Sequence, residues 1–243
     1  MPSLRSLLSN VAPPSNAPQK TFYVYYADHY INQATGANCV WTVPAGVTSV
    51  TFELWGGGGG GPAARCCAGP ITNGGGGGYA IRTITTSPGC QYTICAGASS
   101  CLSSGCLGCS GYPSYVTGSG IATTCASGGT GGKMCCFSSS MQTCCGSIPS
   151  GSVNQGDFTM AGTNGTILAD GCFYSHAQLP GSPPGNGIFN RGRNWIAAWR
   201  SQGDAIGKPT FPGGGGMGGY DCCCYVCTCG GWGAGGLVKV TYS

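Results

Sequence analysis

Charged side chains are scarce in this chain of 243 residues. Lys, Arg, Asp and Glu together make up 7% of it, against about 25% in a typical soluble domain. Only 6 residues are acidic and 2 are histidines, and these are the groups that acid–base catalysis uses most. The composition therefore argues against an enzyme. It also excludes a charged disordered tail, because such tails have few aromatic residues, whereas 10% of this chain is aromatic.

Long apolar runs and a dense basic surface are also missing. No run approaches the ~18 apolar residues of a membrane helix. The net charge of +4 is spread thinly, whereas nucleic-acid-binding domains carry a concentrated basic stripe. The first residues lack the apolar core of a secretory signal. We therefore expect no cofactor, no nucleic-acid partner and no membrane insertion.

Glycine, in contrast, is abundant, at 48 residues. It occurs in runs at residues 56–61, 74–78 and 213–216, which excludes the every-third-residue glycine of collagen. Such runs are either flexible linkers or ordered segments in which backbones pack closely, because no Cβ stands between them. Extended segments that rise about 3.1 Å per residue, as in polyproline II, can stack as a lattice. We favour ordered packing, because cysteines and tryptophans border the runs.

The remaining sequence predicts strands. The clearest pattern is at residues 47–55, where Val50, Phe52 and Leu54 alternate with polar residues, as in a half-buried strand. Five further segments rich in β-branched and aromatic residues predict strands at 21–26, 39–43, 79–84, 91–95 and 237–242. The fold class is therefore all-β, with long ordered polyglycine loops.

One short helix is expected at residues 194–200, where Asn194 is a candidate N-cap. It would place Trp195 and Trp199 on one face, beside Arg191 and Arg193. These side chains either stack on a sugar or an anionic glycan, or anchor the helix to the strand core. The candidate receptor- or glycan-binding residues are Trp195, Trp199, Arg191, Arg193 and Trp232.

The 19 cysteines are clustered in or beside the glycine-rich loops. Neighbouring cysteines rarely bond each other, because a disulfide needs Cα atoms ~5.5 Å apart. Each adjacent pair is therefore expected to tie its loop to two other places, at roughly 2–4 kcal/mol per bridge. The expected disulfide cysteines are Cys66, Cys67, Cys90, Cys95, Cys101, Cys106, Cys109, Cys125, Cys135, Cys136, Cys144, Cys145, Cys222, Cys223, Cys224, Cys227 and Cys229.

Two alternatives to disulfides remain open. The CxxC pairs at residues 106–109 and 224–227 could form a four-thiolate zinc site, although their separation far exceeds that of a compact zinc ribbon. The cysteines could also be reduced thiols. We expect no metal. The odd number of cysteines leaves at least one without a partner in its own chain.

Residues 41–59 carry the clearest resemblance to a known glycine-rich family. They run from WTVPAGVTSV through an aromatic residue into polyglycine. Residues 77–80, 88–97 and 235–242 supply its further motifs. The chain thus resembles the glycine-rich domain of bacteriophage tail-fibre and appendage proteins, over roughly residues 39–243. The resemblance implies a β-sandwich-like body, a symmetric assembly (usually a trimer) and a place on the virion surface, often in host recognition.

The resemblance also suggests how the chain is divided. Residues 1–20 are expected to be a virion-attachment segment and linker that binds other virion proteins, and residues 21–243 a glycine- and cysteine-rich β domain. The expected function is a tail fibre or tip adhesin that contacts a host surface glycan or protein, made in the host cytosol and exposed at lysis. The alternatives are a capsid-decorating or connector protein with a mechanical role, and a glycan-cleaving depolymerase.

Overall fold

The computed structural model describes residues 19–26, 37–62, 68–100, 107–136, 155–162, 165, 167–168, 211–216 and 231–243. Within these ranges the chain forms strands and extended segments and no helix. The prediction of an all-β fold is therefore confirmed. The helix expected at residues 194–200 lies outside the described residues.

The larger sheet has five antiparallel strands in the order β1-β12-β3-β5-β10. They span Lys20–Tyr25 (β1), Leu237–Tyr242 (β12), Ser49–Trp55 (β3), Tyr79–Thr85 (β5) and Phe158–Met160 (β10). In β3 the buried Val50, Phe52 and Leu54 face inward, while the residues between them face outward. This is the expected alternation of a strand with one face on a core.

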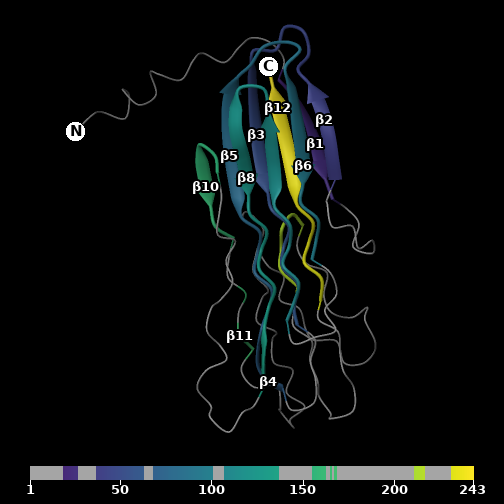
Figure 1. Cartoon of the computed structure of the whole chain (residues 1–243), viewed down its shortest axis with the longest axis vertical. Coiled ribbons are helices and arrows are strands. Elements are labelled where there is room, and N and C mark those ends of the chain that lie inside the picture. The colour runs from purple at the N-terminus through teal and green to yellow at the C-terminus, as the bar shows by residue number, and fades with distance from the viewer. Residues whose placement is uncertain are drawn as a thin grey trace, which may run out of the picture.

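The second sheet has four antiparallel strands in the order β2-β6-β7-β8. They span Ala37–Thr42 (β2), Gln91–Ala96 (β6), Ser114–Gly118 (β7) and Ile121–Ala126 (β8). The two sheets enclose one hydrophobic core, in which Phe52 of the first contacts Tyr92 of the second, with ring centroids 5.5 Å apart. This half of the molecule is a β-sandwich (Figure 1).

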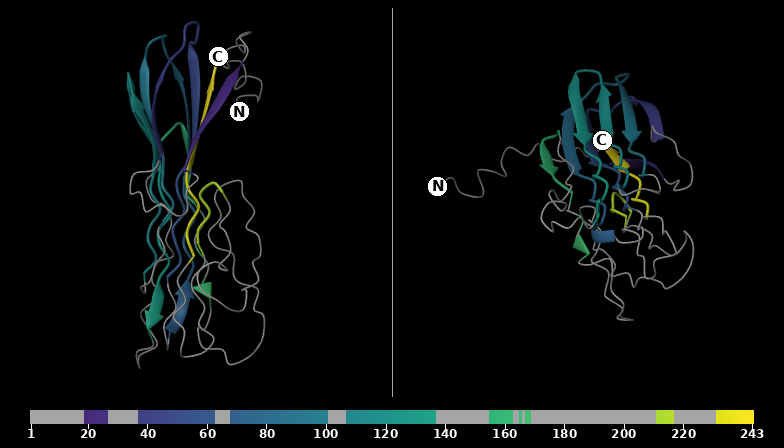
Figure 2. Two further views of the ribbon diagram at one scale, coloured as in Figure 1. Left: turned by 90° about the vertical axis from the view of Figure 1, so that its right-hand side faces the viewer. Right: turned by 60° about the horizontal axis from the view of Figure 1, so that its bottom comes forward.

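The strands of the sandwich continue beyond it as glycine-rich segments. Residues 56–62 follow β3, residues 97–100 follow β6 and residues 127–133 follow β8, while residues 73–78, 107–113 and 231–236 lead into β5, β7 and β12. Together with residues 213–216 they run side by side away from the sandwich (Figures 1 and 2). We call these segments the glycine bundle.

A third, small sheet lies at the end of the glycine bundle away from the sandwich (Figure 1). It is formed by β4 (Ala68–Thr72), β9 (Met134–Cys136) and β11 (Ile167–Leu168), in the order β11-β4-β9. Both neighbours pair antiparallel with β4. The molecule thus has a sandwich at one end, the glycine bundle in the middle and a short sheet at the far end.

All six predicted strands are confirmed, and β12 has the predicted bounds. The β7–β8 hairpin was not predicted, because its strands are rich in Ser, Thr, Ala and Gly and lie within a glycine- and cysteine-rich stretch. Its turn does carry a signal: Gly120 has φ of 71°, a conformation that glycine adopts without steric cost. Val116 and Ala126 supply the buried apolar positions of the hairpin.

Candidate functional site

The centre of the glycine bundle is the run of residues 56–61, which we call the central run. Its backbone N–H groups donate to three neighbouring segments in turn. Gly56 and Gly59 donate to the carbonyls of Gly78 and Gly75, and Gly57 and Gly60 to those of Tyr112 and Cys109. Gly58 and Gly61 donate to those of Ala234 and Gly231. These six hydrogen bonds are 2.8–2.9 Å long and repeat every three residues.

Three more segments lie close to the Cα atoms of the central run, where side chains would otherwise stand. An added Cβ on Gly56 would meet the carbonyl of Ser127, one on Gly57 the carbonyl of Ala98, and one on Gly58 the carbonyl of Gly214. Two of these segments also donate back to the central run, through Gly129 to Gly57, Gly132 to Gly60 and Gly216 to Gly59. Six segments therefore surround the central run.

A repeat of three residues identifies the geometry of the segments. A polyproline II helix has three residues per turn and no internal hydrogen bonds, so successive N–H groups point in three directions and are available to neighbours. An α-helix would have used these groups internally, and a strand would have directed them to only two sides. The glycine bundle is therefore a lattice of extended helices joined by backbone hydrogen bonds. The predicted ordered packing of the glycine runs is confirmed.

Glycine is required because the segments approach too closely for side chains. At 19 glycines of the described bundle an added Cβ would lie less than 3.0 Å from a neighbouring backbone atom, a distance that real Cβ contacts essentially never show. The close atom belongs to a backbone, which cannot rotate away as a side chain can. Any side chain on an inward side of these helices would therefore force the segments apart.

The spacing of glycines in a segment, which repeats every three residues, indicates which of its sides face neighbouring segments. Residues 127–133 read Ser-Gly-Gly-Thr-Gly-Gly-Lys. Gly128 and Gly131 pack on the carbonyls of Gly111 and Gly108, whereas Gly129 and Gly132 pack on those of Gly75 and Thr72. The third side carries the side chains of Ser127, Thr130 and Lys133. Two glycines in three residues thus mark a segment whose Cα atoms meet neighbouring backbones on two sides.

The same rule holds for the segment at residues 107–113, where glycine occurs once in three residues. Gly108 and Gly111 face the central run, against the carbonyls of Gly60 and Gly57. The other sides carry larger side chains, and Leu107, Ser110 and Tyr112 are exposed. The central run, which is glycine throughout, lies in the interior and is wholly buried. The number of glycines per turn therefore indicates how deeply a segment lies in the lattice.

The far end of the described bundle presents few side chains. Leu107 and Lys133 form an isolated antiparallel bridge there, and both are exposed, Leu107 at 63%. Lys133 donates its backbone N–H to Thr72 Oγ1 at 2.7 Å and its carbonyl accepts from the Thr72 backbone N–H at 2.8 Å. This end is therefore held by the same backbone network as the rest of the bundle.

The outer face of the five-stranded sheet carries a second candidate surface, which we call the aromatic face. Trp55 and Tyr79 lie opposite each other there, with ring centroids 5.0 Å apart, and both are buried. Large apolar side chains around them are exposed. They are Tyr23, Tyr25, Phe158, Met160 and Phe211. Phe211 contacts Tyr25 and Phe158 contacts Tyr79 through their rings, so these side chains form one cluster.

A polar group of three residues lies within the aromatic face. Lys239 Nζ is 2.6 Å from Glu53 Oε1, and the Tyr79 hydroxyl donates to Glu53 Oε2 at 3.2 Å. Burial raises the pKa of Tyr79 to about 12, and the nearby Glu53 carboxylate adds to the shift. The hydrogen bond to Glu53 raises the pKa of Lys239. Both carboxylate oxygens of Glu53 are thus engaged in holding the sheet together.

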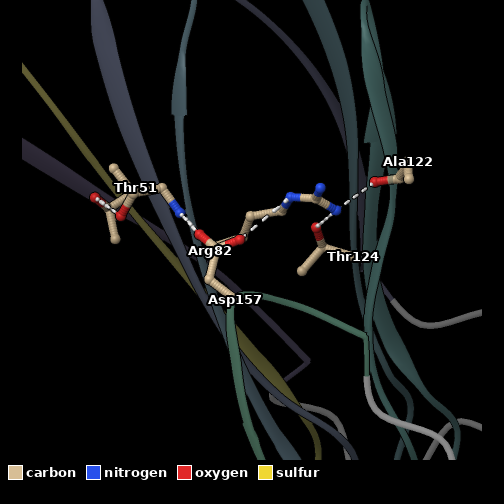
Figure 3. A network of polar contacts seen from close by, with 6 residues as sticks. Thr51, Arg82, Ala122, Thr124 and Asp157 are labelled. Atoms are coloured by element: carbon tan, nitrogen blue, oxygen red, sulfur yellow. Dashed lines mark hydrogen bonds and ion pairs between the residues drawn. The ribbon is translucent and has the colours of Figure 1, made fainter.

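A second polar network joins the two sheets at the side of the sandwich where β5 lies beside β8 (Figure 3). Arg82 on β5 donates through one guanidinium nitrogen to the Ala122 carbonyl at 3.1 Å and lies 3.5 Å from Thr124 Oγ1 on β8. Asp157 Oδ2 accepts the backbone N–H of Thr83 at 2.8 Å, and its Oδ1 lies 3.9 Å from Arg82 Nε. The arginine links the two sheets, and Asp157 holds the segment before β10 against β5.

A glycan-cleaving depolymerase would need a pair of carboxylates, and two of the described carboxylates lie in these networks. Asp157 bonds the backbone of β5 and Glu53 bonds Lys239 and Tyr79. Asp170, Asp204 and Asp221 lie outside the described residues. Among the described residues no group of three or more His, Cys, Asp or Glu side chains is arranged to hold a metal ion. The described part of the chain also contains no helix long and apolar enough to cross a membrane.

Of the five predicted binding residues, the structure describes only Trp232. It is half-buried and lies in the bundle segment that hydrogen-bonds to the central run. Trp195, Trp199, Arg191 and Arg193 lie outside the described residues. Sequence reasoning did not single out the aromatic face. The alternation of Tyr23 and Tyr25 on β1 was the signal that would have pointed to it.

The disulfide prediction is wrong for Cys90, Cys95 and Cys125, which carry thiols, as does Cys39. Tyr115 lies between Cys95 and Cys125 on the same face of adjacent strands. Two strand spacings amount to about 9.6 Å, beyond the reach of a disulfide. Burial raises the pKa of the Cys39, Cys95 and Cys125 thiols, which makes them poor nucleophiles.

Cys109, in the glycine bundle, is disulfide-bonded. The side chains of the other expected disulfide cysteines lie outside the described residues. They are Cys66, Cys67, Cys101, Cys106, Cys135, Cys136, Cys144, Cys145, Cys222, Cys223, Cys224, Cys227 and Cys229. The described thiols therefore belong to the sandwich, where they pack as small apolar side chains.

Comparison with known proteins agrees with this architecture. The chain matches the family described as "Glycine-rich domain" over residues 33–243. No curated protein matches the chain significantly. The matched range contains β2 to β12 and every segment of the glycine bundle. This protein therefore belongs to the glycine-rich domain family.

Proposed function

We propose that this protein is a virion structural protein, a tail fibre or tip adhesin, in which the sandwich is the base and the glycine bundle is a rigid stalk. The observation that carries the proposal is the hydrogen-bond lattice around the central run. A flexible linker would leave these backbone groups to water. Here they hydrogen-bond to five neighbouring segments, so the far end is held at a fixed position relative to the sandwich.

The two ends of the molecule differ in a way that suits this role. Lys20 at the start of β1 pairs with Tyr242 at the end of β12, so both lie at the sandwich end away from the bundle (Figure 1). Connections to other virion proteins at that end would leave the far end of the bundle free. The resemblance of residues 41–59 to phage tail-fibre and appendage domains supports the virion assignment.

The far end is where we place contact with a host surface glycan or protein. Its described exposed side chains are Leu107 and Lys133, one apolar and one cationic. A rigid scaffold that positions a small exposed surface is a common arrangement for recognition, because little conformational entropy is lost on binding. The sparse charge of the chain would leave short-range contacts as the main source of affinity.

The first experiment determines where the protein sits. Antibodies against the purified protein are applied to purified particles and viewed by electron microscopy. Labelling at tail or fibre tips is expected. Labelling distributed over the capsid would support the mechanical, capsid-decorating role instead, and particles without the protein would refute both.

The second experiment tests host contact. Fluorescently labelled protein is titrated onto cells of the strain that produces the particles, and saturable binding is expected. The double variant Leu107→Ser, Lys133→Glu should bind at least tenfold more weakly, whereas Thr85→Ser, at an exposed position of the sandwich, should bind like the wild type. Absence of binding by the wild type would refute the adhesin. Reducing sugar released from host polysaccharide would favour the depolymerase.

A further inference from the structure

The first strand, β1, forms an open edge of the five-stranded sheet. It pairs with β12 on one side, and no strand among the described residues pairs with its other side. The backbone N–H of Tyr26 donates to Gly236 across the β1–β12 pair. Because backbone groups alternate in direction along a strand, the odd-numbered Thr21, Tyr23 and Tyr25 direct their N–H and C=O groups away from β12.

Within the described part of the chain, this edge lacks the features by which proteins protect exposed strands. Such features are bulges, prolines, inward-pointing charges and covering segments. The β1 sequence Lys-Thr-Phe-Tyr-Val-Tyr has no proline and one charge, at its first residue. Its pairing with β12 is regular throughout. Thr21, Tyr23 and Tyr25 are exposed, the two tyrosines at 56% and 54%.

The opposite edge of the same sheet is protected. Beyond the short β10, the backbone N–H of Thr83 on β5 is taken by the carboxylate of Asp157 (Figure 3). A side chain thus occupies the position that a further strand would need. In the other sheet, the edge strand β8 is partly covered, because Cys125 bridges to Gln155. The contrast indicates that β1 is left open for a partner.

We propose that β1 pairs antiparallel with β1 of a second copy of this chain, about a two-fold axis that passes through Tyr23. In this register Tyr23 lies opposite Tyr23 of the second copy, and Thr21 opposite Tyr25. All three outward-facing residues of each strand then face each other, which gives six backbone hydrogen bonds between the copies. A shift by two residues in either direction would leave only four.

The side chains also fit this register. On the outer face it places tyrosine opposite tyrosine and threonine opposite tyrosine. On the inner face it places Phe22 opposite Val24, an aromatic and β-branched pair of the kind that stabilises sheets. Lys20 lies opposite Tyr26 and not opposite another lysine, so no like charges meet. The aromatic faces of the two copies become continuous.

The edge of the second sheet lies on the same side of the sandwich (Figure 1). The backbone N–H of Val43 donates to the carbonyl of Cys90, just before β6. The backbone groups of Asn38, Val40 and Thr42 of β2 therefore face away from β6, and Val40 is 66% exposed. Phe22 and Trp41 contact each other between the sheets, at 5.5 Å, and β1 and β2 run in opposite directions. Val40 therefore lies at the level of Tyr23, and the same axis brings the two Val40 side chains toward each other.

Pairing of identical antiparallel strands is isologous and closes with two copies. It therefore favours a dimer over the trimer that the family resemblance implies. The inference does not depend on the proposed function, because it rests on the backbone and side chains of the β1 and β2 edges. It adds a ten-stranded sheet, shared by two sandwiches, to the architecture of the single chain.

The test is the mass of the full-length protein in solution, by light scattering on a sizing column at about 10 µM. A dimer is expected for the wild type. Tyr23→Lys and Tyr23→Glu each place like charges opposite each other across the axis and should weaken dimerisation by tenfold or more, which corresponds to about 1.4 kcal/mol. An equimolar mixture of the two variants should form a heterodimer, because lysine then lies opposite glutamate.

The mixing step separates a lost interface from a lost fold, since a misfolded variant would not regain dimerisation on mixing. Thr85→Lys, an exposed position on β5 of the same sheet, is the matched control and should remain dimeric. A monomeric or trimeric wild type would overturn the proposal. Tyr23 variants that stay dimeric, or a mixture that stays monomeric, would overturn the placement of the axis at Tyr23.

Discussion

A single β-carbon decides whether the glycine lattice can close. Gly58 packs against the backbone carbonyl of Gly214, and Gly58 also donates its N–H to Ala234. A methyl group at this position cannot be accommodated by rotating a side chain. The segments must instead separate, which lengthens hydrogen bonds on both sides. The substitution therefore weakens the backbone hydrogen bonds, which are the main interaction available to segments without side chains.

We therefore expect Gly58→Ala to destabilise the protein by at least ~1–3 kcal/mol, the usual range for overpacking. Urea or thermal unfolding measures this loss. Thr130→Val is the control within the bundle, because Thr130 Oγ1 is buried without a hydrogen-bond partner, so its removal should be neutral or slightly stabilising. A Gly58→Ala variant as stable as the wild type would contradict close packing of the central run.

The buried Tyr79 makes a second prediction at this scale. Its pKa is raised from 10.0 to about 12 by burial and by Glu53. A raised pKa means that folding favours the protonated phenol, so its contribution is complete below pH 10 and is lost as the pH rises toward 12. Lys239, whose pKa is also raised, loses its contribution in the same direction.

Wild-type stability should therefore fall steeply above pH 10, and Tyr79→Phe should lower stability at neutral pH but flatten this fall. Unfolding midpoints measured between pH 8 and 11 test the effect. Tyr112→Phe removes an exposed hydroxyl and should keep the wild-type profile. Equal slopes for Tyr79→Phe and the wild type would show that the phenol does not titrate within the Glu53 network.

At the scale of single elements, strands were more predictable than the bundle. The alternation of Val50, Phe52 and Leu54 reports burial of one face, and it predicted β3 directly. In β7 and β8 the small Ser, Thr and Ala residues provide little hydrophobic contrast, so sequence patterning could not separate strand from loop. These strands are fixed by pairing with β6 and by the core contacts of Val116, which are long-range interactions.

The sequence predicted that the glycine segments are ordered and closely packed, but it did not predict which segments are neighbours. Polyglycine indicates close approach, and ordered packing was expected. Which segments become neighbours depends on the positions of the sandwich strands from which they continue. The period of three in residues 127–133 reports that two sides are covered, although it does not name the covering segments. The aromatic face was missed because Tyr23, Trp55 and Tyr79 come from three strands that meet only in the folded sheet.

The short element β10 offers a test of how a strand edge is closed. Asp157 accepts the Thr83 N–H at 2.8 Å, whereas its ion pair with Arg82 is long and exposed and contributes little. Asp157→Ala should therefore cost ~0.5–1.5 kcal/mol, the net value of one hydrogen bond. Asp157→Asn keeps an acceptor oxygen and should cost less. Equal losses of stability in the Ala and Asn variants would show that the charge of Asp157, and not its hydrogen bond, stabilises this edge.

At the scale of the whole molecule, the hydrogen-bond lattice holds glycine, the most flexible residue, in an ordered stalk. Glycine loses more backbone entropy on folding than any other residue, and each hydrogen bond returns only about 0.5–1.5 kcal/mol net. The segments are therefore stable together and not singly. They are also continuous with β3, β5, β6, β7, β8 and β12, so the sandwich strands set the relative positions of these segments.

Such coupling predicts that the glycine bundle opens as one cooperative unit, which hydrogen exchange measures. In native protein, peptides covering residues 56–62, 74–78 and 127–132 should exchange slowly and at similar rates, with protection comparable to that of β3. Gly58→Ala should lower protection in all three segments together, because each bonds to the central run or to its neighbour, while the buried strands β3 and β6 retain theirs. Fast exchange of the glycine segments in the wild type would instead describe flexible linkers, and loss confined to residues 56–62 would show that the segments are held independently.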